Sequence, residues 1–252
     1  MIDNLKHFAR IAKSKYDQFS FEPYEPYIEP INVKGVDARF YFGTGQAKKW
    51  YGHLNPFSKL EYEWILSTID FHNQKIIDGG SHHGHYSVIF AAGSENTCNL
   101  ISVDPFPMNC LLTEINLRLN NYEPHIEKCA ISTQNGQVRF ENISNGRILK
   151  DGGIVVPAKR LVSIMPDAEI IKLDIEGAEF DVIPDSIGDL VNVRTWIVEV
   201  HPSKYHLPDE LVDQFKENNY QLLWVNRDRV CVEKYKLGTQ WNFHHTTIFA
   251  IR

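Results

Sequence analysis

The segment Ile76-Ile77-Asp78-Gly79-Gly80-Ser81-His82-His83-Gly84 decides the fold of this chain of 252 residues. It joins a short apolar run, Lys75–Ile77, to a stretch with helical character, Tyr86–Ala92, through a glycine-rich turn. A strand, a glycine-rich turn and a helix in this order open the nucleotide-binding unit of α/β proteins, in which backbone amides at the helix N-terminus face a ligand. We therefore expect a buried strand that ends near Asp78 and a ligand at the turn.

The spacing within this turn selects between ligands. A dinucleotide fingerprint ending at Gly84 requires a glycine where Ser81 stands, and a phosphate-binding P-loop requires Lys-Ser/Thr where His85-Tyr86 stand. The remaining pattern is Asp78-x-Gly80-x-x-x-Gly84, which puts a carboxylate beside the turn. A carboxylate repels a pyrophosphate and pairs with an ammonium group. S-adenosylmethionine has such a group and no phosphate, so the turn is interpreted as a site for S-adenosylmethionine.

Composition excludes several classes of protein. The hydrophobic content of 43% and charged content of 23% are ordinary for a globular protein, and the net charge of −6 disfavours nucleic acid as a partner. No apolar run approaches the ~20 residues of a membrane span. The four cysteines share no C-x-x-C spacing, and no signal peptide is recognisable, so we expect a cytoplasmic protein. The expected partner is a small-molecule or glycan acceptor, and a homodimer is compatible with the sequence.

Continuous apolar runs alternate with helical stretches, which predicts a doubly wound α/β fold. The expected strands are Lys75–Ile77, Leu100–Val103, His125–Ala130, Ile170–Leu173, Trp196–Val200, Tyr220–Val225 and Thr246–Ile251. The expected helices are Leu60–Ile69, Tyr86–Ala92, Asn109–Asn120, Phe180–Ile183 (ending at Pro184) and Leu211–Asn218. We predict a mostly parallel, seven-stranded sheet with an antiparallel C-terminal strand, and Val230–Tyr235 as a further short strand candidate.

Residues 1–60 are expected to form an N-terminal extension to a domain of residues 61–252. The pattern predicts a helix over Asn4–Tyr16, an extended proline-rich arm and a strand over Val36–Phe42. Trp50 and Tyr51 suit stacking on a sugar ring. Covering a sheet edge or forming a dimer contact is an equally good interpretation of these aromatic residues.

Asp104 follows the second strand of the predicted unit, in Ile101-Ser102-Val103-Asp104-Pro105. An acidic residue at this position accepts hydrogen bonds from the ribose hydroxyls of a bound nucleoside. The alternative is an aspartate that caps the turn before Pro105. Its combination with Asp78-x-Gly80 favours the ribose contact.

The segment Lys172 to Glu179 reads Lys-Leu-Asp-Ile-Glu-Gly-Ala-Glu. Asp174 closes an apolar strand, so it is expected at the edge of the sheet where ligands of α/β proteins bind. Glu176 and Glu179 are interpreted either as site residues or as caps of the following helix.

Glu199 and His201 share parity in the strand Trp196–Val200 and its continuation, so both point to one face. His201 stands at the strand's end, where an imidazole can take a proton from a substrate hydroxyl near neutral pH. A structural role for this histidine is the alternative.

The turn histidines His82, His83 and His85 do not have the spacing of a zinc site, and no cysteine ligand lies near them. We expect one of them to approach the substrate or cofactor. His244 and His245 are interpreted as surface residues, and no metal site is predicted.

Five motifs in order resemble the FkbM-type family of S-adenosylmethionine-dependent methyltransferases, over roughly Leu60 to Pro202. They are Asp78-Gly79-Gly80-Ser81-x-x-Gly84, Asp104-Pro105-x-Pro107-x-Asn109, Val156-Pro157-Ala158-x-x-Leu161, Lys172-Leu173-Asp174-Ile175-Glu176-Gly177-Ala178-Glu179 and Glu199-Val200-His201. The sequence departs from the family pattern at His82-His83 and at Arg160-Leu161-Val162. The resemblance implies the class I, Rossmann-like methyltransferase fold and methylation of hydroxyl oxygens, often on sugars or polyketide-type natural products.

The predicted function is therefore S-adenosylmethionine-dependent O-methylation of a hydroxyl, with a sugar or glycan as acceptor. The predicted cofactor site comprises Asp78, Gly79, Gly80, Ser81, Gly84, Tyr86, Ser87, Asp104, Pro105, Asn109, Ala130 and Asp174. The predicted substrate site comprises His82, His83, Trp50, Tyr51, Glu176 and Glu199. His201 is the expected base and Asp174 its rival or orienting partner.

Three alternatives remain open. A divalent ion held by Asp174 with Glu199 or His201 would acidify the hydroxyl in place of a base. A nicotinamide-dependent oxidoreductase is disfavoured by the missing glycine at Ser81 and by the carboxylate of Asp78. A binding protein that has lost catalysis is disfavoured by the presence of Asp174 and His201.

Overall fold

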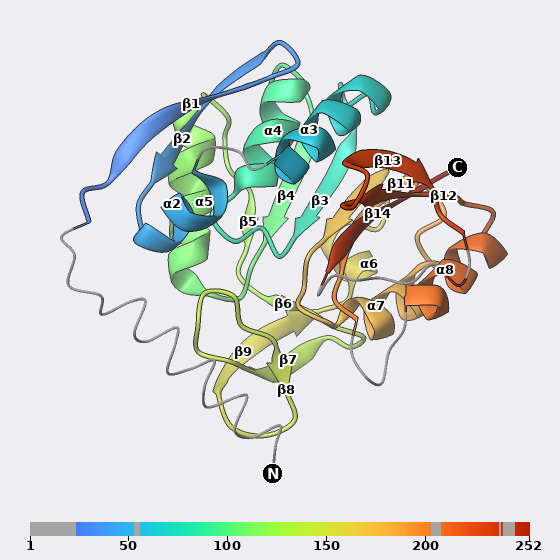
Figure 1. The fold of residues 1–252 in the computed structure, drawn as a ribbon. Coiled ribbons are helices and arrows are strands. Elements are labelled where there is room, and N and C mark those ends of the chain that lie inside the picture. The colour runs from blue at the N-terminus through green and yellow to red at the C-terminus, as the bar shows by residue number, and fades with distance from the viewer. Residues whose placement is uncertain (1–23, 53–55, 203–207, 237, 239–244) are drawn as a thin grey trace.

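The computed structural model describes residues 24–52, 56–202, 208–236, 238 and 245–252. In this part of the chain, eight strands form one sheet in the order β13-β12-β14-β11-β10-β3-β4-β5 (Figure 1). Their bounds are β3 Lys75–Gly79, β4 Asn99–Val103, β5 Ile126–Glu127, β10 Ile170–Leu173, β11 Thr195–Val200, β12 Gln221–Asn226, β13 Cys231–Lys234 and β14 Thr246–Ile251. β13 adds an eighth strand to the predicted seven, at the place of the candidate run Val230–Tyr235.

The central strands β5, β4, β3, β10 and β11 are parallel, and β14 lies antiparallel between β11 and β12. The predicted antiparallel C-terminal strand is thus confirmed. The chain runs outward from β3 to β5, then returns to β10 on the other side of β3. Such a reversal leaves a crevice at the carboxyl ends of the two strands, where ligands of open α/β sheets bind.

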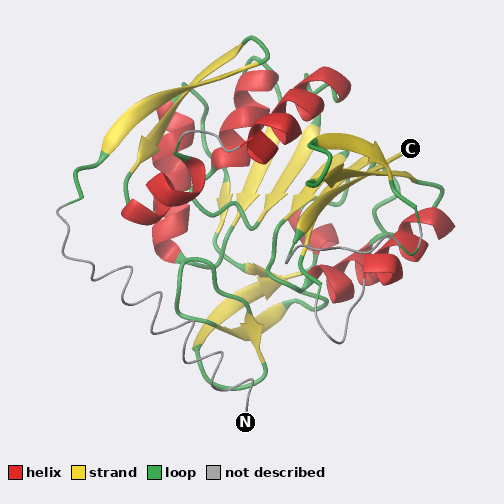
Figure 2. Cartoon of the chain, viewed as in Figure 1, coloured by secondary structure: helices red, strands yellow, loops and turns green. Residues whose placement is uncertain are grey.

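Helices cover both faces of the sheet (Figure 2). One layer contains α3 (Pro56–Thr68), α4 (His85–Gly93) and α5 (Pro107–Leu119), and the other contains α6 (Leu161–Ile164), α7 (Glu179–Ser186) and α8 (Pro208–Glu217). Consecutive strand residues alternate between the two cores: Ile76 packs with the first layer, and Ile77 with the second. This alternation explains the continuous apolar runs, because both faces of each strand are buried.

Residues before position 61, the predicted domain boundary, extend the core between the sheet and the layer of α3, α4 and α5. β1 (Tyr27–Val33) and β2 (Val36–Phe42) form an antiparallel hairpin, followed by α2 (Gly45–Tyr51). Phe40 and Phe42 belong to the same buried cluster as Ile65 of α3 and Val88 of α4. The predicted strand over 36–42 is confirmed, whereas the helix expected at Asn4–Tyr16 and the start of the arm lie outside the described residues.

A second sheet, of four strands in the described chain, was not predicted. It has the order β6-β9-β7-β8, with β6 Ala130–Ile131, β7 Gly136–Phe140, β8 Ile148–Leu149 and β9 Ile154–Lys159. The carboxyl ends of β3 and β4 point towards it (Figure 1). The single strand expected over His125–Ala130 is wrong: a turn in which Cys129 N donates to Glu127 O divides it into β5 and β6 in different sheets.

The predicted end of one helix at Pro184 is also wrong. α7 continues through Pro184 to Ser186. The proline removes one N–H from the helix, but the next turn is kept because Ile187 N donates to Ile183 O at 2.9 Å.

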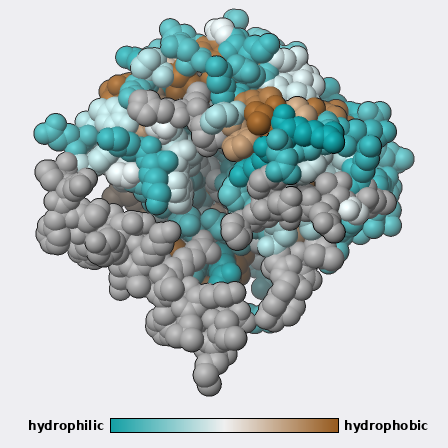
Figure 3. Space-filling model, in the orientation of Figure 1, coloured by the Kyte–Doolittle hydropathy of each residue, from teal (hydrophilic) through white to brown (hydrophobic). Residues whose placement is uncertain are grey.

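The described surface seen in Figure 3 is largely hydrophilic, with scattered hydrophobic areas. Within the described residues, the helices are all too short or too polar to cross a membrane.

Candidate active site

A cavity of about 660 Å³ opens at the carboxyl ends of β3, β4, β10 and β11. Its walls come from three parts of the chain: the glycine turn and the strand ends, the second sheet, and the segment around α2 and α3. Ligand pockets of small molecules commonly measure about 300–1,000 Å³, so the cavity is large enough for a nucleoside ligand with an acceptor beside it.

The glycine turn approaches β10 so closely that only glycine fits. Gly80 has φ +69°, and a Cβ atom there would lie 1.8 Å from the carbonyl oxygen of Asp174. Gly80 N and Ser81 N both donate to Val103 O, at 2.9 and 3.0 Å, which ties the turn to β4. Ser81 Oγ is buried and has no hydrogen-bond partner among the described residues, so it is available to a ligand.

Asp78 does not reach this cavity. Its side chain is fully buried; one oxygen accepts from Ser87 Oγ at 2.5 Å, and the other lies 3.5 Å from Lys172 Nζ. The expected pairing of Asp78 with an ammonium group of the ligand is therefore wrong, because Lys172 already occupies the position of the cation. Asp78 instead supports the glycine turn through Lys172, which also contacts Gly80.

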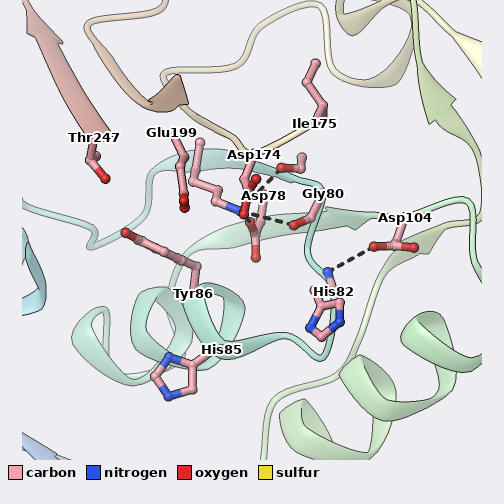
Figure 4. A network of polar contacts seen from close by, with 12 residues as sticks. Asp78, Gly80, His82, His85, Tyr86, Asp104, Asp174, Ile175, Glu199 and Thr247 are labelled. Atoms are coloured by element: carbon pink, nitrogen blue, oxygen red, sulfur yellow. Dashed lines mark hydrogen bonds and ion pairs between the residues drawn. The ribbon is translucent and has the colours of Figure 1, made fainter. Parts of the chain in front are cut away.

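Lys172 joins three parts of the site through its contacts with Asp78, Gly80 and Asp174. Figure 4 labels these three partners. Besides Asp78, its ammonium group donates to Gly80 O at 3.1 Å and lies 3.8 Å from Asp174 Oδ2. It also lies 5.0 Å from the centre of the Tyr86 ring. Burial lowers the pKa of Lys172, but Asp78, Asp174 and Glu199 outweigh it, so the pKa rises and the group stays charged.

Asp104 lines the cavity at the end of β4 and is 5% exposed. It accepts from His82 N at 3.0 Å, from Phe106 N at 2.8 Å and from Asn109 Nδ2 at 3.1 Å. Figure 4 shows the first of these bonds. Burial raises the pKa of Asp104 to about 7, against the lowering effect of these donors. Asp104 thus both caps the turn and lines the cavity.

Asp174, Glu199 and His201 come together at the ends of β10 and β11 and all line the cavity. His201 Nδ1 contacts Glu179 Oε1 at 2.9 Å, and its Nε2 lies 3.8 Å from Asp174 Oδ1 and 4.0 Å from Glu199 Oε1. Burial opposes protonation of the ring, but the bond to Glu179 and the charges of the carboxylates outweigh it and raise the pKa of His201 to about 10. Burial also raises the pKa of Glu199 to about 8.

This geometry argues against His201 as the base. Both ring nitrogens face carboxylate oxygens, so both carry a proton in the ligand-free arrangement and no lone pair is available. The sequence did not show that Glu179, from α7, contacts the ring at Nδ1. The assignment of His201 as the base stays a prediction.

The turn histidines occupy an aromatic wall. His82 contacts Tyr51 Oη at 2.7 Å and Ser144 Oγ at 2.8 Å, and its ring lies 4.9 Å from Trp50. His82 and Trp50 line the cavity, whereas His83 stacks behind His82 and does not. Burial lowers the pKa of His82 well below its usual range and that of His83 to about 4, so both rings are neutral at pH 7.

The remaining predicted residues divide between the cavity and its support. Those that line it are Gly80, Ser81, Tyr86, Pro105, Ala130, Tyr51 and Glu176. Those that lie outside the lining are Gly79, Gly84, Ser87 and Asn109. Asn109 supports Asp104 and Ser144, and Ser87 supports Asp78.

Sequence reasoning missed several cavity residues. Glu61 accepts from Tyr86 Oη at 2.7 Å and from Thr247 Oγ1 at 2.8 Å, and Arg227 lies over the Phe57 ring. His245, interpreted as a surface residue, is half-buried in the cavity wall. No local pattern marks these residues, because they reach the cavity from distant parts of the chain: Glu61 from α3, Arg227 from just after β12 and His245 from just before β14.

Comparison with known proteins agrees with this geometry. The family model of the methyltransferase FkbM domain matches residues 78–222. The chain belongs to the FkbM methyltransferase domain family. The match begins at Asp78, so it includes the glycine turn, Asp104, Asp174 and His201. No match was found among curated protein sequences.

Solved structures show the same fold. The FkbM methyltransferase of Methylobacillus flagellatus superposes with a TM-score of 0.52 at 16% identity, over 78% of this FkbM-family chain and 48% of that chain. The Thermus thermophilus 16S rRNA N2 G1207 methyltransferase, solved with AdoMet and guanosine, superposes with a TM-score of 0.50 at 13% identity, over 91% of this chain and 51% of that one. This chain thus spans about half the length of each. The predicted class I, Rossmann-like methyltransferase fold is confirmed.

Proposed function

We propose that the chain transfers a methyl group from S-adenosylmethionine to a hydroxyl oxygen. The observation that carries this proposal is the Gly80 turn, whose bare Cα lies against Asp174 O beside a buried, unpartnered Ser81 Oγ. Membership of the FkbM methyltransferase family supports methyl transfer as the activity.

The lining of the cavity fits the parts of S-adenosylmethionine in order. Ala130, Ile131 and Phe140 give an apolar wall that suits an adenine ring. Asp104 lines the same cavity, where a carboxylate can accept from ribose hydroxyls. Gly80 and Ser81 would then hold the methionine end. When bound, S-adenosylmethionine supplies a methyl group on a positively charged sulfur, and the electron pair of the broken S–C bond returns to that sulfur as the new O–C bond forms.

The chain must also accept the proton of the attacking hydroxyl. Asp174 is the carboxylate placed for this step: its side chain is 31% exposed, it lines the cavity, and it follows β10 directly beside the glycine turn. Lys172 and His201 flank it and fix its orientation. General base catalysis contributes about 10²–10⁴ in rate, and positioning of the two reactants contributes several kcal/mol more.

The acceptor is proposed to be a sugar or glycan hydroxyl. Trp50 is 37% exposed at the cavity, and Tyr51 and His82 continue the aromatic wall beneath it. Such a surface stacks on the C–H face of a sugar ring, while Glu176 and Glu199 supply acceptors for neighbouring hydroxyls.

The first test is calorimetric titration of the purified protein with S-adenosylmethionine, S-adenosylhomocysteine and NAD in parallel. Micromolar binding of both sulfur ligands and none of NAD is expected. A panel of glycan acceptors is then assayed with radiolabelled methyl donor. Asp174→Asn should bind the donor and lose about 10²–10⁴ in turnover, while Asp167→Asn, an exposed carboxylate outside the cavity, should behave as wild type. Absence of binding by either sulfur ligand would overturn the proposal.

A further inference from the structure

Two histidines that lie far apart in the sequence meet at the end of the β11–β14 ladder. Glu199 pairs with Thr247 and Val200 with Thr246, so continuing the register by one residue puts His201 opposite His245. Their rings lie 5.6 Å apart, centre to centre. Figure 1 shows β11 and β14 side by side, and Glu199, His201 and His245 all line the cavity. The imidazoles and the Glu199 carboxylate thus converge from adjacent strands.

The distances between their donor atoms are those of a metal site. Glu199 Oε1 lies 3.2 Å from His245 Nε2 and 4.0 Å from His201 Nε2. One ligand atom from each of the three residues lies within 4.8 Å of the other two. Atoms bound to a common ion at about 2.1 Å are separated by about 3.0–4.2 Å, so only a small contraction is needed.

The orientation of His201 carries a second, independent indication. Its Nδ1 contacts Glu179 Oε1 at 2.9 Å, and Glu179 is fully buried. A histidine that ligates a metal usually donates its other ring N–H to a carboxylate in this way, which fixes the tautomer and the ring plane. Glu179 therefore turns Nε2 of His201 towards Glu199 and the cavity.

We propose that Glu199, His201 and His245 bind one divalent transition-metal ion at the acceptor side of the cavity. Two imidazole nitrogens and one carboxylate suit Zn²⁺, Mn²⁺ or Fe²⁺ better than Mg²⁺ or Ca²⁺, which prefer oxygen ligands throughout. The ion also brings positive charge to a site where three carboxyl groups, those of Asp174, Glu179 and Glu199, surround His201.

Three protein ligands leave coordination positions open towards the cavity. An acceptor hydroxyl at such a position becomes more acidic, and Asp174, 3.8 Å from His201, lies close enough to take its proton. This role rests on the proposed function, whereas binding of the ion does not.

The test uses the tag-free, full chain after dialysis against a chelator. Zn²⁺ is titrated in competition with a chromophoric chelator, and Mn²⁺ is followed by electron paramagnetic resonance. One equivalent of metal should bind to the wild type. Glu199→Gln and His245→Asn should each weaken binding at least tenfold, and Glu179→Gln by about 10–100-fold. Circular dichroism and thermal unfolding confirm that each variant is folded.

His72→Asn is the matched control. His72 also pairs with a carboxylate, Asp70 at 2.8 Å, but both side chains are exposed. This variant should bind metal as the wild type does. Absence of a saturable site, or His245→Asn binding metal with wild-type affinity, would overturn the proposal.

S-adenosylmethionine binding is measured on the same samples, which separates the two proposals. Donor binding without metal binding contradicts the metal site alone. Metal binding without donor binding contradicts the methyltransferase function alone.

Discussion

The ammonium nitrogen of Lys172 lies 3.5 Å from Oδ1 of Asp78, and both side chains are buried. The same ammonium group donates to Gly80 O and faces Asp174. One buried cation thereby connects the end of β3, the glycine turn and the end of β10. The geometry of the cavity depends on this connection, because neither Asp78 nor the turn has another cation within contact distance among the described residues.

Lys172→Met is expected to destabilise the fold strongly. The variant keeps the length of the side chain but leaves Asp78 buried and uncompensated, which costs about 3–5 kcal/mol of unfolding free energy. Urea unfolding followed by circular dichroism measures the loss. The double variant Lys172→Met with Asp78→Asn removes the uncompensated charge and should recover part of the lost unfolding free energy.

Lys75→Met supplies the control for this prediction. Lys75 also pairs with an aspartate, Asp167, but both side chains are well exposed. Water screens an exposed pair, so its loss should change stability little. Equal losses for Lys75→Met and Lys172→Met would contradict the role assigned to the buried pair.

Gly80→Ala should abolish binding of the methyl donor. Its backbone has a positive φ, and the added Cβ would lie 1.8 Å from Asp174 O, so the turn must move away from β10. Gly152→Ala is the matched control, because Gly152 has φ +76° and open space where a Cβ would lie. That variant should lose about 1–2 kcal/mol of stability from strain alone and bind the donor normally. Calorimetric titration distinguishes them; normal donor binding by Gly80→Ala would place the ligand elsewhere.

The strands that are buried on both faces could be predicted from the sequence. Ile170–Leu173 and Thr246–Ile251 have the expected bounds, because a strand covered on both faces is buried at nearly every position and therefore mostly apolar. The small sheet was missed for the opposite reason. β9 is buried on one face only and contains Pro157, which argues against a strand, and β6 is only two residues long.

The sequence alone could not predict two properties of the site: the direction in which each side chain points, and which distant strands pair. Asp78 and Asp174 both follow or end apolar strands, yet only Asp174 lines the cavity. What distinguishes them is Ser87 and Lys172, which hold Asp78 away from it. His245 reaches the cavity only because β14 pairs with β11, and no spacing within the sequence reports that register.

The affinity for S-adenosylmethionine should fall as the pH drops below about 7. Burial raises the pKa of Asp104 to about 7, and only its ionised form offers all its lone pairs to ribose hydroxyls. Near pH 6, affinity should be about tenfold weaker than on the plateau. The stability of the ligand-free protein depends on pH in the opposite direction. Because the pKa of Asp104 is raised in the folded state, Asp104 contributes stability at low pH, and this contribution is lost as the pH rises through about 7.

Calorimetric titration between pH 5.5 and 7.5 measures the dependence on Asp104. Asp104→Asn should bind the donor weakly and with a flatter pH profile, because its amide does not titrate. A variant with the wild-type slope would assign the dependence to another group.

His85 should make the fold less stable in acid. Burial lowers the pKa of His85 from 6.5 to about 3, so between these values the unfolded chain binds a proton that the folded chain does not. Stability is therefore complete above pH 6.5 and is lost as the pH falls, by about 1.4 kcal/mol per pH unit. His85→Phe should unfold in urea with a pH dependence shallower by this amount between pH 6 and 5. Tyr62→Phe removes the same 2.6 Å contact but keeps the titrating ring, so it should retain the wild-type slope. Parallel curves for the wild type and His85→Phe would show that the ring takes up its proton in the folded state.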